Sequence, residues 1–265
     1  MTEPIQTVYL ANIGNSSIEC GKVKVFPHTG PLAVTDVLRT DLKSHAMTEV
    51  DQWFSRQRPA NERWFVGSVC SEGLREFEKW LSRRASRENR HLLSHVDFDL
   101  HVSLDFPERI GTDRLAAATA ANCRRNPTGS AVVVDSGTAV TVDLVDEKGV
   151  FQGGAILPGL KLAAESLGWG TDQLPTVDIA RFDEVPPFLG KDTVQAIRVG
   201  LYWGTVGAIE RIVEGMRAQL SEPSEIFLTG GGGDLIAKQL RTASRYVPTL
   251  VLEGLALAAE NVCSR

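Results

Sequence analysis

Two stretches of this 265-residue chain share one pattern of residue types. Residues 8–19 read VYLANIGNSSIE, and residues 132–143 read VVVDSGTAVTVD. Each has an apolar run, an amide or acid, a glycine among small hydroxyl residues, and a second apolar run. A glycine lets the backbone approach a phosphate, hydroxyl and N–H groups donate to its oxygens, and a carboxylate holds a cation beside them. The pair predicts two phosphate-binding hairpins, although each alone could be a plain β-turn.

Two further segments could bind or activate a substrate. Residues 228–234, LTGGGGD, lie between a predicted strand and helix, where bare backbone suits a nucleotide; the alternative is a flexible loop. Residues 111–114, GTDR, place Asp113 and Arg114 at a helix start, where Asp113 could accept a proton and Arg114 could pair with a carboxylate. The alternative is a helix-terminal acid and a surface ion pair. No GxxxxGK[ST] triple occurs, which argues against a P-loop kinase.

Mixed strands and helices must position these segments. In the first half, we expect strands at 8–11, 17–25, 63–69 and 95–104, and helices over most of 32–53, over 71–85 with Ser71 as N-cap, and from Asp113 to about Arg125. In the second half, we expect a three-stranded meander from 131, helices after Pro158 and over about 192–220, a strand, loop and helix around the four glycines, and a closing helix. The turn at 126–130 predicts domains 1–125 and 126–265, and the repeated order indicates duplication.

Composition narrows the class of protein. The formal charge is −5, and the most basic stretch, Arg83–His91, reads as a solvated helix end or loop, so we expect no nucleic-acid partner. The four cysteines are scattered, which predicts reduced thiols and no zinc site. Neither a leader pattern at residues 1–10 nor a long apolar segment is evident, which predicts a cytoplasmic protein without a membrane partner.

Together the motifs resemble those of the type III pantothenate kinases, in the acetate and sugar kinase, Hsp70 and actin superfamily. The resemblance spans most of the chain and keeps the order of its motifs. They are NIGNS (12–16), FPERIGTDR (106–114), VDSGTAVTVD (134–143), GGAILPG (153–159) followed by Leu174-Pro175, GKDTVQAIRVG (190–200) and TGG (229–231).

The resemblance implies an α/β fold of two ribonuclease-H-like, actin-like ATPase domains with a nucleotide cleft between them. It implies ATP-dependent phosphorylation of pantothenate to 4′-phosphopantothenate, the first step of coenzyme A biosynthesis. It also implies Mg²⁺ with ATP, a monovalent cation (K⁺ or NH₄⁺) and a homodimer.

Residue roles follow from the same resemblance. Asp113 is the implied general base, and Asp135 is the implied ligand of the monovalent cation. The implied pantothenate site comprises Leu104, Gly111, Thr112, Asp113, Arg114 and Thr193. The implied ATP site comprises Asn12, Ile13, Gly14, Asn15, Ser16, Ser17, Thr138, Gly230 and Gly231.

Three residues depart from the family pattern. Asn12 replaces the usual Asp, Leu104 stands where many members have Tyr, and Phe106 replaces the usual Asn. Asn12 keeps the shape of an aspartate but not its charge, which predicts weakened or lost catalysis. Two alternatives therefore stay open: a regulatory or binding protein that keeps the fold, and a kinase of another small hydroxyl compound.

Overall fold

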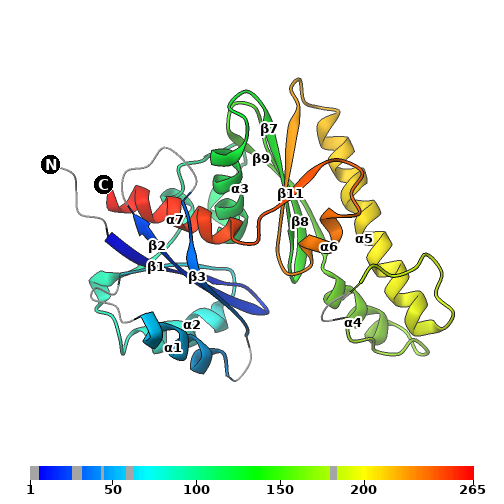
Figure 1. The fold of residues 1–265 in the computed structure, drawn as a ribbon, viewed down its shortest axis with the longest axis horizontal. Coiled ribbons are helices and arrows are strands. Elements are labelled where there is room, and N and C mark those ends of the chain that lie inside the picture. The colour runs from blue at the N-terminus through cyan, green and yellow to red at the C-terminus, as the bar shows by residue number, and fades with distance from the viewer. Residues whose placement is uncertain (1–5, 26–31, 43–44, 58–62, 180–183) are drawn as a thin grey trace. The chain divides into compact units, whose positions relative to one another are not determined.

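The computed structural model describes residues 6–25, 32–42, 45–57, 63–179 and 184–265. The chain divides into two compact units (Figure 1). Unit 1 comprises Met1–Arg124 and Thr249–Arg265, and unit 2 comprises Arg125–Pro248. The turn at 126–130 predicts a second domain over all of 126–265, whereas residues 249–265 belong to unit 1. Residues 1–5, half of the segment without a leader pattern, lie outside the described residues.

Unit 1 is built on a five-stranded sheet with the order β3-β2-β1-β4-β5. Its strands are β1 (Gln6–Ile13), β2 (Ser17–Val25), β3 (Thr35–Asp41), β4 (Trp64–Ser68) and β5 (Arg90–Leu92). The central strand β1 pairs antiparallel with β2 and parallel with β4. The predicted strands at 8–11, 17–25 and 63–69 are confirmed.

Helices cover both faces of this sheet. On one face, α1 (Ala46–Gln57) and α2 (Ser71–Leu81) enclose an aromatic core that includes Tyr9, Phe54 and Trp64. On the other face, α7 (Leu250–Cys263) packs against β1, β2 and β4, and α3 (Thr112–Arg124) packs against α7. Figure 1 shows α1 and α2 below the sheet and α7 and α3 above it.

Several predictions for unit 1 were wrong. Thr35–Asp41 is a strand rather than a helix, because its backbone extends the sheet beside β2, with Arg39 opposite Glu19. Residues 43–44 of that predicted helix lie outside the described residues. The N-cap of α2 is Cys70, whose Sγ accepts a hydrogen bond from Gly73 N at 3.4 Å, and the helix ends at Leu81.

The segment 95–104 is also not one strand. It holds a 3₁₀ turn (η2, His95–Asp97) and the two-residue strand β6 (His101–Val102). The carboxylate of Asp97 accepts hydrogen bonds from Ser94 N and Oγ at 2.8 and 3.0 Å, which turns the chain back on itself. Two further 3₁₀ turns, η1 (Arg87–Asn89) and η3 (Pro107–Arg109), were not predicted.

Unit 2 is built on a second sheet, five of whose strands run in the order β11-β10-β7-β8-β9. They are β7 (Ser130–Ser136), β8 (Ala139–Val145), β9 (Val150–Pro158), β10 (Ser224–Thr229) and β11 (Ser244–Tyr246). The valines at alternate positions of β7 and β8 form one core with α4 (Leu160–Gly170), α5 (Thr193–Arg217) and α6 (Gly233–Ala237). The predicted meander and helices are confirmed, and the long helical segment is one helix.

The two sheets have equivalent strand orders. In unit 1, β1 pairs antiparallel with β2 and parallel with β4, and in unit 2, β7 pairs antiparallel with β8 and parallel with β10. Position by position, the order β3-β2-β1-β4-β5 corresponds to β9-β8-β7-β10-β11. This correspondence supports the duplication that the two hairpin motifs suggested.

Cys20, Cys70, Cys123 and Cys263 form no disulfide in the structure. No helix in the described part of the chain is both long and apolar enough to span a lipid bilayer.

Close packing of α3 and α7 gives a first testable prediction. A Cβ at Gly254 of α7 would collide with the carbonyl oxygen of Ala116 in α3, whereas a Cβ at Gly204 of α5 would meet open space. We expect Gly254→Ala to lower the free energy of unfolding by about 1–3 kcal/mol through overpacking. Gly204→Ala should instead raise it by up to about 1 kcal/mol, because alanine favours helix. Urea unfolding followed by circular dichroism measures both, and equal effects would contradict the packing argument.

Candidate functional site

The first phosphate-type turn closes the β1–β2 hairpin in unit 1. Gly14 N donates to Ser17 O at 2.9 Å, and Leu42 N donates to Ser16 O at 2.8 Å. Val69 N, just after β4, donates to Ile13 O at 3.0 Å. Neighbouring segments therefore hold both sides of the turn, and Asn15 and Ser16 remain exposed at its tip.

The segment Gly111–Arg114 lies at the start of α3, as predicted. Thr112 Oγ1 donates to Ser68 O at 3.3 Å, which fixes the helix start to the end of β4. The Asp113 Oδ1 atom accepts a hydrogen bond from Arg114 N at 2.8 Å. A Cβ at Gly111 would lie 2.5 Å from the same oxygen, so a larger residue there would move this carboxylate.

Strand register brings the turn and the helix start to one end of the unit 1 sheet. Asn12 lies opposite Gly67 of β4, and Ile13 lies opposite Ser68. A Cβ at Gly67 would lie 3.4 Å from Thr112 Oγ1. The predicted first phosphate loop and the predicted general base thus belong to adjoining segments of unit 1.

Residue 12 has an unusual environment. The Asn12 Oδ1 atom is buried and has no hydrogen-bond partner among the described residues. Directly across on β2 is Glu19, whose carboxylate forms an ion pair with Arg39 Nε at 2.6 Å. Burial raises the pKa of Glu19 above its ordinary value, and the charge and hydrogen bond of Arg39 counteract part of that rise. Sequence reasoning missed Glu19, although its place seven residues after Asn12 in a predicted hairpin could have indicated the pairing.

The second phosphate-type turn and the glycine loop meet within unit 2. Asp135 of β7 lies opposite Thr229 of β10, and both strands end next to a turn. Gly137 N donates to Ala139 O at 3.0 Å, and Gly159 N donates to Thr138 O at 3.0 Å. The two segments are separate in the sequence, and the parallel pairing of β7 with β10 brings them together.

Gly230 requires its glycine for two reasons. Its φ angle is +85°, and a Cβ there would lie 2.5 Å from the Asp135 Oδ1 atom. The next glycine, Gly231, has open space around its Cβ position. Tyr246 Oη donates to Gly230 O at 3.1 Å, which fixes the loop from the side of β11.

These two glycines give a matched prediction. Gly230→Ala should lower the free energy of unfolding by about 1–3 kcal/mol, because alanine is strained at a positive φ and displaces Asp135. Gly231→Ala should change the free energy of unfolding by no more than about 0.5 kcal/mol. Urea unfolding followed by circular dichroism provides the measurement. A loss at Gly231 as large as that at Gly230 would contradict this reading of the loop.

The remaining predicted site residues are more dispersed. Leu104 is exposed in the bend before η3, and the neighbouring Phe106 carries the Arg109 guanidinium 4.4 Å from its ring centroid. Thr193 is the first residue of α5 and exposed, with Asp192 as the N-cap that accepts from Gln195 N. Thr193 therefore belongs to unit 2, while Gly111–Arg114 belong to unit 1.

Asp143 is a buried acidic residue that the sequence did not indicate as a site residue. It lies on β8 with only 1% of its surface exposed, opposite Val133 and Gly154. A Cβ at Gly154 would lie 2.5 Å from Asp143 Oδ1, so this glycine makes room for the carboxyl group. The alternation of the motif VDSGTAVTVD places Asp143 on the strand face opposite Val140 and Val142, so the local pattern did not indicate its burial.

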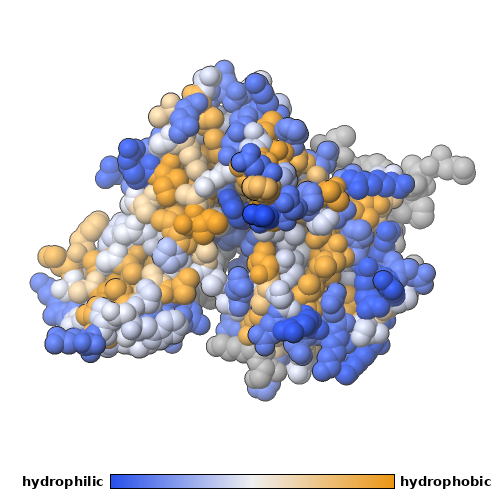
Figure 2. Space-filling model, turned by 180° about the vertical axis from the view of Figure 1, so that it is seen from behind, coloured by the Kyte–Doolittle hydropathy of each residue, from blue (hydrophilic) through white to orange (hydrophobic). Residues whose placement is uncertain are grey.

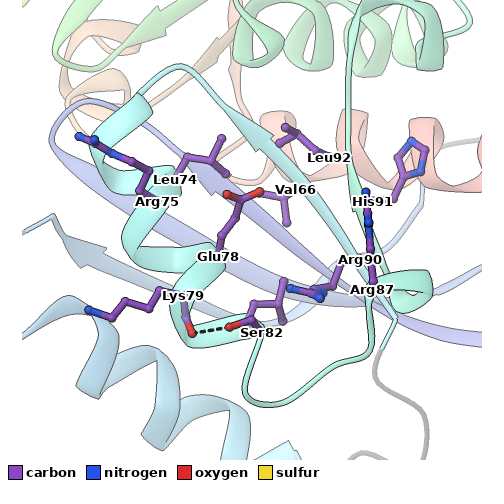
Figure 3. A pocket seen from close by; sticks show the side chains of 11 residues that line it. Val66, Leu74, Arg75, Glu78, Lys79, Ser82, Arg87, Arg90, His91 and Leu92 are labelled. Carbon is purple, nitrogen blue, oxygen red and sulfur yellow. Dashed lines mark hydrogen bonds between the residues drawn. The ribbon is translucent and has the colours of Figure 1, made fainter.

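A groove of about 520 Å³ lies elsewhere in unit 1, between α2 and β5. Figure 3 shows Leu74 and Glu78 of α2, Val66 of β4 and Arg90 of β5 around it. None of the predicted site residues lines this groove. Its floor is apolar, and its rim is mainly basic, with Glu78 as the one acidic side chain among those that line it.

The described residues hold no group of three or more His, Cys, Asp or Glu side chains suited to binding a metal ion. A metal in this chain would therefore need amide, hydroxyl or backbone oxygens, or oxygens of a bound substrate, in addition to single carboxylates. Mg²⁺ is commonly held in this way, with one or two carboxylates and substrate phosphates. Asn12 Oδ1, which lacks a partner among the described residues, and the Glu19 carboxylate are two such oxygens in unit 1.

Comparison with known proteins shows which family the chain belongs to. Residues 9–215 match the family described as type III pantothenate kinase. The chain belongs to this family. A type III pantothenate kinase of Acidiphilium cryptum is 34% identical over 194 residues, which cover 73% of this chain and 71% of that protein. One of Rhodopirellula baltica is 46% identical over 167 residues, covering 62% and 59%.

Solved structures support the fold of this family member. The activator of 2-hydroxyisocaproyl-CoA dehydratase from Clostridium difficile, with bound ADPNP, aligns with a TM-score of 0.52 and 12% identity, covering 98% of this chain and 97% of that one. A 2-dehydro-3-deoxygalactonokinase-like protein from Sinorhizobium meliloti gives a TM-score of 0.52 at 16% identity, covering 96% and 99%. At such low identity these likenesses show the fold alone. They confirm the predicted class, two α/β domains of the actin-like ATPase type.

Proposed function

We propose that this protein transfers the γ-phosphoryl group of ATP to the hydroxyl group of pantothenate, forming 4′-phosphopantothenate and ADP. Family membership supplies the activity. The observation that carries it in this chain is Asp113 at the start of α3, tied through Thr112 to the strand end beside the turn after Asn12. That arrangement can accept a proton next to a phosphate-binding turn.

In this mechanism, Asp113 accepts the proton of the pantothenate hydroxyl as that oxygen attacks the γ-phosphorus of ATP. The bond to the β,γ-bridging oxygen breaks and ADP leaves. Arg114 pairs with the pantothenate carboxylate, while Gly111, Thr112, Leu104 and Thr193 complete the substrate site. Such transfer depends mainly on positioning and on neutralising charge, so residues that hold the two substrates dominate the rate.

ATP binding would use both turns and the glycine loop. Residues 12–17 and Thr138 offer N–H and hydroxyl donors to phosphate oxygens, and Gly230 and Gly231 offer bare backbone. Asp135 would hold K⁺ or NH₄⁺, supported by its place between the turn at Gly137 and the loop at Gly230. Mg²⁺ bound with ATP would neutralise charge on the transferred phosphoryl group.

Two alternatives keep specific support. Asn12 lacks the negative charge of the usual aspartate, which favours a regulatory or binding protein that retains the fold. Leu104 and Phe106, 39% and 53% exposed, favour a kinase of a different small hydroxyl compound, because both stand where the family has polar residues. ADP release from a panel of hydroxyl compounds distinguishes them: a binding protein gives none, and a different kinase prefers another compound.

The proposal includes a homodimer. Large apolar side chains gather over α4 and the segment that leads into α5, seen at the lower left of Figure 2. Trp169, Phe188 and Leu189 are 75%, 74% and 71% exposed, which is unusual for a monomer surface. Phe188 stacks on Trp203 with ring centroids 4.2 Å apart, so this patch is held in place. We propose that a second copy of the chain covers it.

We also propose a cytoplasmic protein without nucleic-acid or membrane partners. Within the basic stretch predicted to be solvated, Arg84 pairs with Asp51, and Arg90 Nε donates to Ser86 O. The formal net charge of −5 also argues against a phosphate backbone as partner.

Asp113→Asn tests the catalytic proposal. Asparagine preserves the size of the side chain but cannot accept the proton, so kcat for ADP release with pantothenate should fall about 10²- to 10⁴-fold. ATP affinity, measured by isothermal titration calorimetry, should stay close to that of the wild type. An unchanged kcat would remove Asp113 from the mechanism.

The dimer proposal predicts that Leu189→Glu produces a monomer, because a charge would be buried at the interface. Val96→Glu, at an exposed apolar residue of unit 1, serves as control and should leave a dimer. Sedimentation equilibrium gives the mass of each. A wild-type monomer, or a Leu189→Glu dimer, would contradict the proposed interface.

A further inference from the structure

The unpaired oxygen of Asn12 needs an explanation. A buried polar atom without a hydrogen-bond partner costs about 1–3 kcal/mol, and native structures contain few of them. Asn12 Oδ1 is such an atom, two residues before the glycine of the first phosphate-type turn. An acceptor left unpaired in this place is suited to a ligand, such as a hard cation that prefers oxygen.

Glu19 lies on the same face of the sheet as Asn12. The two residues are direct partners across β1 and β2, and directly opposite side chains point to one face. Gly67, opposite Asn12 on β4, and Gly21, two residues after Glu19, would both bring a Cβ against leucines of α7. The pair therefore lies on the α7 face, where the start of α3 also lies.

Arg39 contacts one oxygen of the Glu19 carboxylate. Arg39, its cross-strand partner on β3, contacts Oε1 through Nε at 2.6 Å. The Glu19 side chain is 12% exposed, and this contact engages its Oε1 atom. Arg39 thus anchors one oxygen, and a second cation would bind through the other.

The second hairpin provides an internal comparison. There, the residue equivalent to Asn12 is Asp135, and its partner across the antiparallel pair is Thr141. In the first hairpin, the corresponding pair is Asn12 and Glu19. Each pair therefore contains one carboxylate, on the first strand in unit 2 and on the second strand in unit 1.

We propose that Asn12 and Glu19 together form the divalent-cation site beside the phosphates, with Glu19 supplying from β2 the negative charge that residue 12 lacks. This rests on the proposed kinase function. Cross-strand neighbours have Cβ atoms about 4.5–5.5 Å apart, a spacing that lets one amide oxygen and one carboxylate oxygen approach a common ion or its bound water. On this proposal, Asn12 still contributes to a cation site, and its substitution for aspartate does not by itself remove the site.

Manganese binding tests this without measuring catalysis. Free Mn²⁺ is followed by electron paramagnetic resonance during titration of the full-length protein with saturating ADPNP. Glu19→Gln, which keeps the shape and removes the charge, should raise the Mn²⁺ dissociation constant about 10- to 100-fold. Glu225→Gln is the matched control, since Glu225 pairs with Arg245 across two strands of unit 2 at 2.9 Å, and its Mn²⁺ affinity should equal that of the wild type.

Rescue separates a cation site from a structural ion pair. Adding Asn12→Asp to Glu19→Gln should restore most of the Mn²⁺ affinity, because the carboxylate returns to the neighbouring strand. If Glu19→Gln leaves the Mn²⁺ constant unchanged, or if the double variant shows no recovery, the proposal is wrong.

The single variant Asn12→Asp provides a second test of the proposal if Glu19→Gln does not fold. Two carboxylates directly opposite each other are destabilising, so its metal-free melting temperature should fall, and Mn²⁺ should restore it. An unchanged melting temperature without metal would show that Glu19 does not face residue 12. These outcomes are independent of the kinase assignment, which fails only if the wild-type protein forms no phosphorylated product.

Discussion

The register of β1 between its two neighbours is the constraint on which the first half of the site depends. β1 is central in its sheet, antiparallel to β2 on one side and parallel to β4 on the other. A shift of one residue would turn Asn12 from the α7 face into the aromatic core and would bring Ala11 in its place. The aromatic residues of that core, Tyr9 and Trp64 among them, hold the register because they fit only one face.

The same constraint operates twice in the chain. In each unit, a hairpin turn and the end of a parallel strand lie side by side, so the backbone donors of both converge on one end of the sheet. Gly67 on β4 gives room for Leu255 of α7, and Gly230 after β10 gives room for the Asp135 carboxylate. The two units differ in which strand of the hairpin carries the carboxylate. In unit 2 it is Asp135 on the first strand, and in unit 1 it is Glu19 on the second strand, opposite Asn12.

Much of this could be predicted from sequence, and the failures have physical causes. The hairpins, the Ala-rich helix after Gly111 and the meander from Ser130 follow from local patterns of β-branched residues, glycines and caps. Thr35–Asp41 could not, because Val34, Val37 and Leu38 are spaced as in a helix and only pairing with β2 makes the segment a strand. The return of α7 to unit 1 depends on contacts across most of the chain, such as Gly254 against Ala116. The family's site residues were located by motif, but the Glu19 carboxylate required the strand register.

One measurement tests the central claim directly. Phosphorus-31 NMR follows the protein with ATP, Mg²⁺, K⁺ and pantothenate, and the product is identified by mass spectrometry. The account predicts a phosphomonoester on the pantothenate hydroxyl that appears in step with ADP. ATP that stays intact with pantothenate present, under conditions where calorimetry shows both to be bound, would contradict it.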